Sequence, residues 1–229
     1  MTDPKSANTI TKVLMAAAID HTILKPNAVQ ADIEKIVEEA RQHAFKAVCV
    51  NSCHVPLVAK LLSGSQIQIC SVVGFPLGAM DSQTKAFEAK TAVEAGATEL
   101  DMVINVGALK SGDLKTVEAD IRAVKEAGGK GYILKVIIET CLLNTEEKVQ
   151  ACKLAKAAGA DFVKTSTGFS TGGATIADVQ LMKTTVGDDL LVKASGGIKD
   201  WATAEAMLRA GASRIGTSSG VTILRGAPK

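Results

Sequence analysis

Aromatic side chains are scarce in this sequence, at 3% of 229 residues, with one tyrosine and one tryptophan. Alanine, valine, isoleucine and leucine must therefore fill the core, and hydrophobic residues reach 47%. Apolar runs long enough to span a bilayer are lacking, and the opening Met1–Ser6 has no signal-peptide pattern. These absences predict a globular α/β protein in the cytoplasm with no membrane partner.

Neither the charged residues nor the cysteines form a pattern typical of nucleic-acid or metal binding. The formal net charge is +2 with both signs interspersed, so no basic stripe is available for nucleic acid. The five cysteines form no Cys-x-x-Cys pair, so neither a zinc site nor a disulfide framework is indicated. Adjacent Cys53 and His54 project differently and have no visible third partner, which favours structural roles. We expect a small-molecule ligand and no metal.

Short apolar runs alternate with longer helical patterns along nearly the whole chain. The runs predict strands near Met15–Ile19, Ala47–Val50, Ile67–Val73, Glu99–Val103, Tyr132–Ile138, Asp161–Lys164, Leu190–Lys193 and Ser213–Gly216. Apolar residues at three- and four-residue spacing predict helices at Ala31–His43, Ser82–Ala95, Leu114–Ala127 and Glu146–Ala158. The expected N-caps are Asp81, Asp113, Thr145 and Asp200.

Eight strands is the number that closes a (β/α)8 barrel, also called a TIM barrel. Repeated strand-helix units without a linker favour this fold, as a single catalytic domain over residues 1–229, above an open doubly wound sheet. In such a barrel the active site lies at the C-terminal ends of the strands. The residues that fall at these ends are Asp101, Glu139, Lys164 and Lys193.

Two lysines end similar strand-like runs, Lys164 in Val163–Gly168 and Lys193 in Leu191–Gly197. Desolvation and mutual repulsion would lower a lysine pKa from about 10.4 and leave a neutral amine that attacks a carbonyl. For any single lysine, a strand-end side chain with its head in water is the commoner explanation. Repetition 29 residues later, about one strand-helix unit, favours a Schiff-base enzyme.

Acidic residues accompany these lysines. Alternation places Glu99 and Asp101 on one strand face, and a buried Asp101 would need cationic partners, which Lys164 and Lys193 would supply. Capping of a loop is the alternative for Asp101 alone. Lys135 and Glu139 share a face of the next strand, where an ion pair or a network role is favoured over direct chemistry.

Three loops of small residues follow the last strands. Ser195–Ile198 and Gly216–Gly220 expose backbone amides, and glycine lets the main chain approach an anion, so a phosphate site is expected there. Either loop alone would indicate only a turn. Thr165–Gly173 follows Lys164, and its Phe169 is expected either to shield the site from water or to pack over the barrel mouth.

At these motifs the sequence resembles the class I 2-deoxyribose-5-phosphate aldolases, from about Ala17 to Ser219. The matching pieces are Asp20-His21-Thr22, Gly74-Phe75-Pro76-Leu77-Gly78, Leu100–Asn105, Lys164–Phe169 and Lys193–Ile198. The resemblance implies a Schiff base on Lys164, with Lys193 as its electrostatic partner and Asp101 in a proton relay. It also implies substrate-binding roles for Thr22, Cys49, Thr167 and Gly168, and phosphate-binding roles for Gly196, Gly197, Gly216, Ser218 and Ser219.

The implied reaction is the reversible cleavage of 2-deoxy-D-ribose 5-phosphate to acetaldehyde and D-glyceraldehyde 3-phosphate, in deoxynucleoside breakdown. No metal or other cofactor is implied, because a protonated imine serves as the electron sink. The resemblance also adds a homodimer as a candidate assembly.

The sequence departs from some members of that family in two ways. Their C-terminal tyrosine, which shuttles a proton, has no counterpart here, because the chain ends at Lys229 and contains only Tyr132. Asp101, Lys193 and ordered water would then transfer the proton. Phe169 stands where some members have a lysine, so phosphate affinity would depend more on backbone amides.

Two other functions stay open on the residues themselves. One is a phosphosugar isomerase or another Schiff-base aldolase, because phosphate loops are widely shared among barrels. The other is a non-catalytic barrel that binds phosphorylated ligands as a regulator. The paired lysines count against the isomerase, and the intact set of Lys164, Lys193 and Asp101 counts against the regulator.

Overall fold

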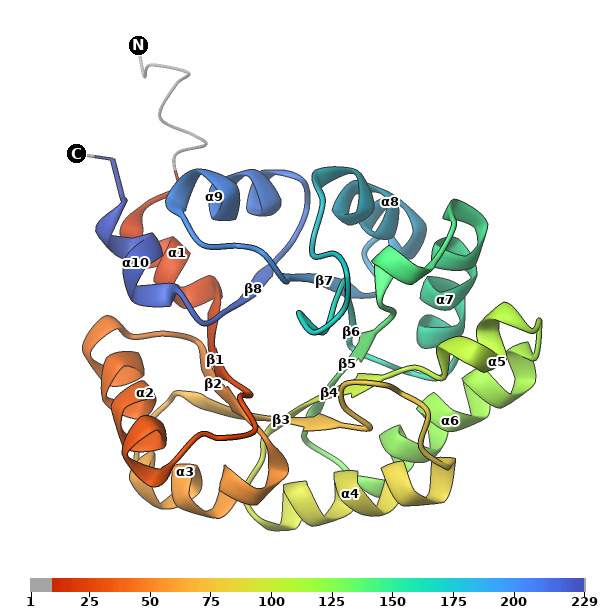
Figure 1. The fold of residues 1–229 in the computed structure, drawn as a ribbon, viewed down its shortest axis with the longest axis horizontal. Coiled ribbons are helices and arrows are strands. Elements are labelled where there is room, and N and C mark those ends of the chain that lie inside the picture. Colours follow the sequence, from red (N-terminus) through yellow and green to blue (C-terminus); the bar gives the residue numbers. More distant parts are fainter. Residues whose placement is uncertain (1–9, 229) are drawn as a thin grey trace.

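The computed structural model describes residues 10–228, which form a closed barrel of parallel strands surrounded by helices (Figure 1). Each strand pairs with the next along the chain, and β8 pairs with β1 to close the ring. This confirms the expected (β/α)8 barrel and excludes the open sheet. The strands are β1 (Ile19–Ile23), β2 (Ala47–Val50), β3 (Gln68–Val73), β4 (Glu99–Val103), β5 (Ile133–Ile137), β6 (Phe162–Lys164), β7 (Leu191–Ser195) and β8 (Arg214–Thr217).

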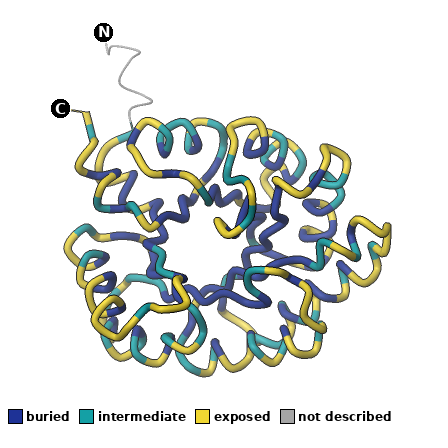
Figure 2. Tube along the Cα trace, viewed as in Figure 1, coloured by how far each residue is buried: buried dark blue, intermediate teal, exposed yellow. Residues whose placement is uncertain are grey.

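The helices form the outer layer around the ring of strands. Figure 2 shows the buried ring of strands and the exposed outer faces of the helices. The α-helices are α1 (Lys12–Ala18), α2 (Gln30–His43), α3 (Val55–Leu61), α4 (Ser82–Glu94), α5 (Val106–Lys110), α6 (Leu114–Ala127), α7 (Thr145–Ala157), α8 (Ile176–Val186), α9 (Trp201–Arg209) and α10 (Gly220–Arg225). Two 3₁₀ turns, η2 (Ser52–His54) and η3 (Thr140–Leu142), follow β2 and β5.

Alternation along each strand separates two environments. In β4, Leu100 and Met102 belong to the apolar core between sheet and helices, whereas Glu99 and Asp101 bind cations inside the barrel. Aliphatic side chains make up most of that outer core, as the scarcity of aromatics predicts. The barrel interior is therefore free to hold charged side chains.

Two local predictions were wrong. Residues 15–18 belong to helix α1, and the first strand begins only at Ile19. Thr11 caps this helix by accepting a hydrogen bond from the Leu14 amide, and the alanines that follow are strong helix formers. The N-cap of α7 is Asn144 rather than Thr145, because Asn144 and Glu147 form a capping box. The other strands and the named helices were predicted to within a few residues.

A buried ion pair joins α4 to α6 outside the barrel. Lys85 Nζ lies 2.5 Å from Asp120 Oδ2 and donates to the Val103 carbonyl at 3.0 Å, at the end of β4. Both side chains are almost completely inaccessible to solvent. Removing one partner would leave a buried charge without compensation.

We expect Lys85→Met to lower the free energy of unfolding by about 3–5 kcal/mol, because Asp120 loses its cation. Urea unfolding would measure this. Lys90→Met on the same helix removes an exposed pair with Glu94 and should change stability by about 0.5 kcal/mol or less. The double variant Lys85→Met/Asp120→Leu should recover most of the loss. Equal stability of the Lys85 and Lys90 variants would contradict the prediction.

Candidate active site

Asp101 is the centre of an ion-pair network inside the barrel. Its Oδ2 atom lies 2.6 Å from Lys164 Nζ and 2.7 Å from Lys193 Nζ, and its Oδ1 atom lies 2.9 Å from Lys135 Nζ. Lys164 and Lys193 are register partners on β6 and β7, and Asp101 and Lys135 are register partners on β4 and β5. The barrel thus brings the predicted lysine pair onto one carboxylate oxygen.

Three further charged residues complete the network, and sequence reasoning gave none of them a role in it. Asp20 lies 2.5 Å from Lys193 Nζ and also binds the Arg214 guanidinium. Glu99 accepts from Arg214 at 2.8 and 3.1 Å and lies 2.6 Å from Lys135 Nζ. The sequence did contain a signal for these residues. Each is an acid or an arginine within a predicted strand or at its end, and a charged side chain that points into the barrel needs a partner there.

The network contains more positive than negative groups. Four cations face three carboxylates: the cations are Lys135, Lys164, Lys193 and Arg214, and the carboxylates are Asp20, Glu99 and Asp101. Loss of one proton from a lysine would therefore make the cluster neutral. Lys135 has the predicted network role, whereas Glu139 binds Thr167 instead.

The carboxylates hold the deeper ammonium groups in their charged form. Burial lowers the pKa of Lys193, but Asp101 and Asp20 outweigh it, so the pKa lies above its ordinary value. Lys135 behaves in the same way. The expectation of a lowered pKa is therefore wrong for Lys193, because it counted the neighbouring lysine and omitted the carboxylates.

The cations keep the acids ionised in return. Burial would raise the pKa of Asp101, but Lys135, Lys164 and Lys193 hold it well below its ordinary value. The pKa of Asp20 is about 2, because Lys193 and Arg214 similarly outweigh its burial. Asp101 is thus a fixed anion that links the amines rather than a strong base.

A cavity of about 520 Å³ opens above this network at the C-terminal ends of the strands. Of the three lysines on Asp101, Lys164 alone lines it, and Lys193 and Lys135 are fully buried. Cys49 is also fully buried, beside Cys70 and Asp101, and does not line the cavity. The other predicted binding residues all line it: Thr22, Thr167, Gly168, Gly196, Gly197, Gly216, Ser218 and Ser219.

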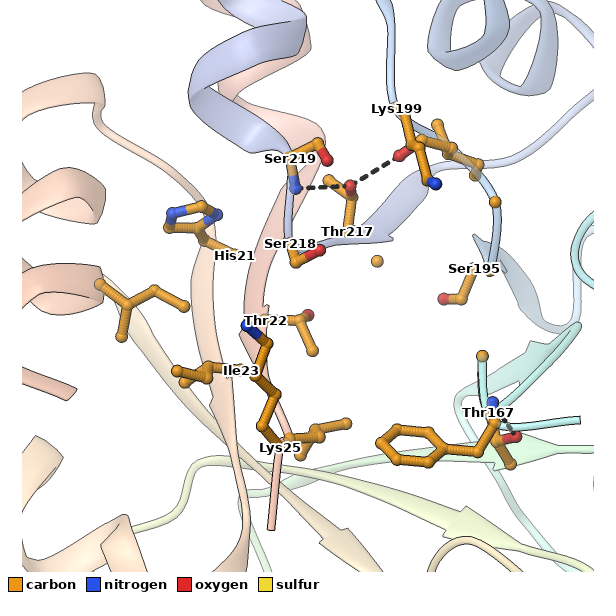
Figure 3. A pocket seen from close by; sticks show the side chains of 18 of the residues that line it. His21, Thr22, Ile23, Lys25, Thr167, Ser195, Lys199, Thr217, Ser218 and Ser219 are labelled. Carbon is orange, nitrogen blue, oxygen red and sulfur yellow. Dashed lines mark hydrogen bonds between the residues drawn. The ribbon is translucent and has the colours of Figure 1, made fainter. Parts of the chain in front are cut away.

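The two glycine-rich loops are joined at one edge of the cavity. Thr217 Oγ1 donates to the Ile198 carbonyl at 2.7 Å and accepts from the Ser219 amide at 2.9 Å, which ties the loop after β7 to the loop after β8 (Figure 3). Gly196 and Gly197 have φ angles of 90° and 79°, in the left-handed region that favours glycine. Space lies open where a Gly197 side chain would project, so an anion can approach the main chain.

Two lysines that sequence reasoning missed also line the cavity. Lys25 follows β1 and Lys199 follows β7, and neither ammonium group binds any atom of residues 10–228. In Figure 3, the Lys25 side chain extends toward Thr22. Loop lysines carry no periodic signal, which is why the sequence did not single them out.

Phe169 lies at the cavity mouth with 54% of its surface exposed. It packs edge-to-face on Phe75, with ring centroids 5.2 Å apart. The loops after β3 and β6 thus meet through one aromatic contact beside the cavity.

One buried group has the side chains of a metal site. The ligand atoms of Cys49, Cys70 and Asp101 lie within 4.8 Å of one another. Lys135 Nζ approaches Cys70 Sγ at 3.5 Å, and both Asp101 oxygens already accept from ammonium groups. A divalent cation there would meet positive charge, so the geometry opposes a metal at this position.

Comparison with known proteins agrees with this geometry. A model of the DeoC/LacD family aldolases matches residues 14–227. The chain belongs to this family. A deoxyribose-phosphate aldolase from Brevibacillus brevis is 62% identical over 209 residues, covering 91% of this chain and 94% of the relative. Another from Streptococcus gordonii is 60% identical over 208 residues, covering 91% and 94%.

A solved member of the family has the same fold. The deoxyribose phosphate aldolase from Aeropyrum pernix, which is described as a tetramer, superimposes with a TM-score of 0.88 at 35% identity, covering 94% of this chain and 91% of that one. The resemblance inferred from the motifs is therefore confirmed. Within the described part of this family member, no helix is long and apolar enough to cross a membrane.

His21 lies at the edge of the cavity, where its Nε2 atom is 2.7 Å from Glu39 Oε2. Burial lowers the pKa of His21 below 6.5, and Glu39 opposes that shift. We expect Glu39→Gln to lower the pKa further, which NMR titration of the ring would measure. In the wild type and in Glu39→Gln, the free energy of unfolding should fall as pH drops from about 6.5 toward the pKa of His21 in the folded protein, because the unfolded chain binds the proton first.

The control variant Glu38→Gln should leave the midpoint of the His21 titration unchanged. A wild-type midpoint at or above 6.5 would contradict the prediction.

Proposed function

We propose that this protein is a class I aldolase that reversibly cleaves 2-deoxy-D-ribose 5-phosphate to acetaldehyde and D-glyceraldehyde 3-phosphate. One observation carries the proposal: Lys164 and Lys193 share an oxygen of Asp101, and Lys164 opens into a cavity with glycine-rich loops at its edge. The identity of the substrate is taken from the relatives of about 60% identity, which match 91% of this chain.

Lys164 is the nucleophile, because it is the amine of the network that a carbonyl in the cavity can reach. Its ammonium group pairs with Asp101, whereas Lys193 pairs with both Asp101 and Asp20. Lys193 and Lys135, whose pKa values are raised, keep their protons. The imine forms from the neutral amine of Lys164, beside the ammonium groups of Lys193 and Lys135.

The other end of the substrate is a phosphate dianion. The amides of Gly168 and Gly197 donate to no atom of the described residues, so they are available to phosphate oxygens. Lys25, after β1, and Lys199, after β7, can add positive charge at this cavity. These groups can bind the phosphate of the substrate even though position 169 is a phenylalanine and carries no positive charge.

The reaction follows from an imine on Lys164. The amine adds to C1 of the open-chain sugar, and the carbinolamine loses water to give a protonated imine. When the C3 hydroxyl loses its proton, the C2–C3 bond breaks, and its electron pair moves into the iminium to give an enamine and glyceraldehyde 3-phosphate. Protonation of the enamine carbon and hydrolysis of the imine release acetaldehyde and restore the amine.

Asp101 connects the two amines during these steps. Because its Oδ2 atom accepts from both Lys164 and Lys193, a proton can move between them with little displacement. When Lys164 is the neutral amine, Lys193 is the protonated member of the pair and can pass a proton to Lys164 through Asp101. Ordered water in the cavity completes the relay to the substrate carbon.

The alternatives are weaker on the same observations. An isomerase has no use for an amine that opens into the cavity beside two fixed ammonium groups. A non-catalytic regulator would not need the buried network beneath its ligand, which is costly to assemble. The homodimer that the family resemblance implies stays a prediction.

The first test is to trap the imine. Incubation with 2-deoxyribose 5-phosphate and sodium borohydride should give a reduced adduct on Lys164, located by peptide mapping, because the protonated imine is the species that hydride reduces. Unreduced protein should release acetaldehyde in parallel, and Lys164→Met should show neither. An adduct on Lys193 would exchange the lysine roles, and turnover without an adduct, or no turnover at all, would contradict the mechanism.

The second test concerns proton transfer. We expect Lys193→Met to slow deuterium exchange into the acetaldehyde methyl group by at least about 100-fold, because it removes the acid of the relay. NMR would follow the exchange, with circular dichroism to confirm folding. Lys183→Met, which removes a surface partner of Asp188, is the matched control. Near-normal exchange in Lys193→Met would refute the role of Lys193.

A further inference from the structure

Glu139 has an unusual backbone conformation at the end of β5. Its φ and ψ angles are 56° and 66°, in the left-handed region that residues other than glycine rarely adopt. The residue is also 97% buried, since its relative exposure is 3%. Such a conformation persists only where surrounding contacts enforce it, and it is often found at functional sites.

The contacts that enforce it come from the loop after β6. The Thr167 amide donates to both carboxylate oxygens of Glu139, at 3.2 and 3.3 Å, and Thr167 Oγ1 lies 2.5 Å from Oε2. The adjacent Thr140 amide donates to the Thr165 carbonyl at 2.9 Å. Glu139 therefore binds the segment that begins at the proposed nucleophile Lys164.

These contacts fix the direction of the Thr167 hydroxyl. A carboxylate only accepts hydrogen bonds, so the Thr167 hydroxyl must donate its one hydrogen to Glu139. One of the two acceptor positions on Oγ1 receives the Phe169 amide at 3.0 Å. No other described residue donates to Oγ1, and Thr167 lines the cavity (Figure 3). Toward a ligand, Thr167 can therefore only accept.

We propose that Glu139 is a specificity-determining positioning residue, which makes Thr167 an obligate acceptor for the C4 hydroxyl of the sugar. This rests on the proposed function. Of the two hydroxyls between the imine carbon and the phosphate, the C3 hydroxyl loses its proton when the C–C bond breaks. The C4 hydroxyl keeps its proton throughout and so can always donate. In the synthetic direction this group is the 2-hydroxyl of glyceraldehyde 3-phosphate.

The test compares two acceptor aldehydes in the addition of acetaldehyde. These are glyceraldehyde 3-phosphate and its 2-deoxy-2-fluoro analogue, whose fluorine has a similar size but donates no hydrogen bond. The readout is the ratio of their kcat/KM values, because the intrinsic reactivity of each aldehyde cancels when variants are compared. For the wild type, we expect kcat/KM for glyceraldehyde 3-phosphate to exceed that for the fluoro analogue by about tenfold or more beyond the intrinsic difference in reactivity. The difference should appear mainly in KM.

Glu139→Gln should reduce the ratio by about tenfold, because the new amide can donate to Thr167 Oγ1 and release the threonine hydrogen toward the ligand. Thr167→Val should reduce it equally, and the double variant should show no further change. Thr167→Ser keeps the hydroxyl and should keep the discrimination. A purely structural role for Glu139 would change kcat/KM for both aldehydes by the same factor.

An unchanged ratio in Glu139→Gln, with folding confirmed by circular dichroism, would overturn the proposal. If Glu139→Gln does not fold, Thr167→Val decides, and discrimination retained in that variant would overturn it equally. Absence of addition with either aldehyde in the wild type would instead remove the proposed function. The two failures are therefore distinguishable.

Discussion

The interaction on which the rest of this structure depends is the burial of the Asp101 carboxylate between three lysine ammonium groups. Its partners come from β5, β6 and β7, so no short segment of the chain could form the cluster by itself. Removing such charges from water is costly, and the barrel compensates by giving each group partners of opposite sign. The cluster therefore depends on the pairing of these strands in the barrel.

The network explains why two similar lysines differ. Lys193 lies between Asp101 and Asp20 and has no access to the cavity, whereas Lys164 contacts Asp101 and opens upward. One lysine is thus held as a fixed cation, and the other is placed where a carbonyl can reach it. The difference arises from the neighbouring carboxylates and from depth in the barrel, because the local sequences are alike.

The edge of the cavity is held by contacts between successive loops. Thr217 joins the loops after β7 and β8, Thr165 exchanges hydrogen bonds with Ser195, and Glu139 binds Thr167. Each contact uses a threonine hydroxyl that already makes hydrogen bonds to neighbouring protein groups. The substrate therefore meets groups with a fixed hydrogen-bonding direction, which is the condition for discrimination among similar sugars.

Periodicity and motif in the sequence by themselves determined the barrel, its helices and the pairing of Lys164 with Lys193 and Asp101, because these depend on strand alternation and on where strands end. Only the tertiary structure decided that Asp20 and Arg214, 194 residues apart, meet inside the barrel, and that Cys49 lies away from the cavity surface. It also reversed the expected direction of the Lys193 pKa. A pKa depends on every charge within a few ångströms, and the sequence does not contain those distances.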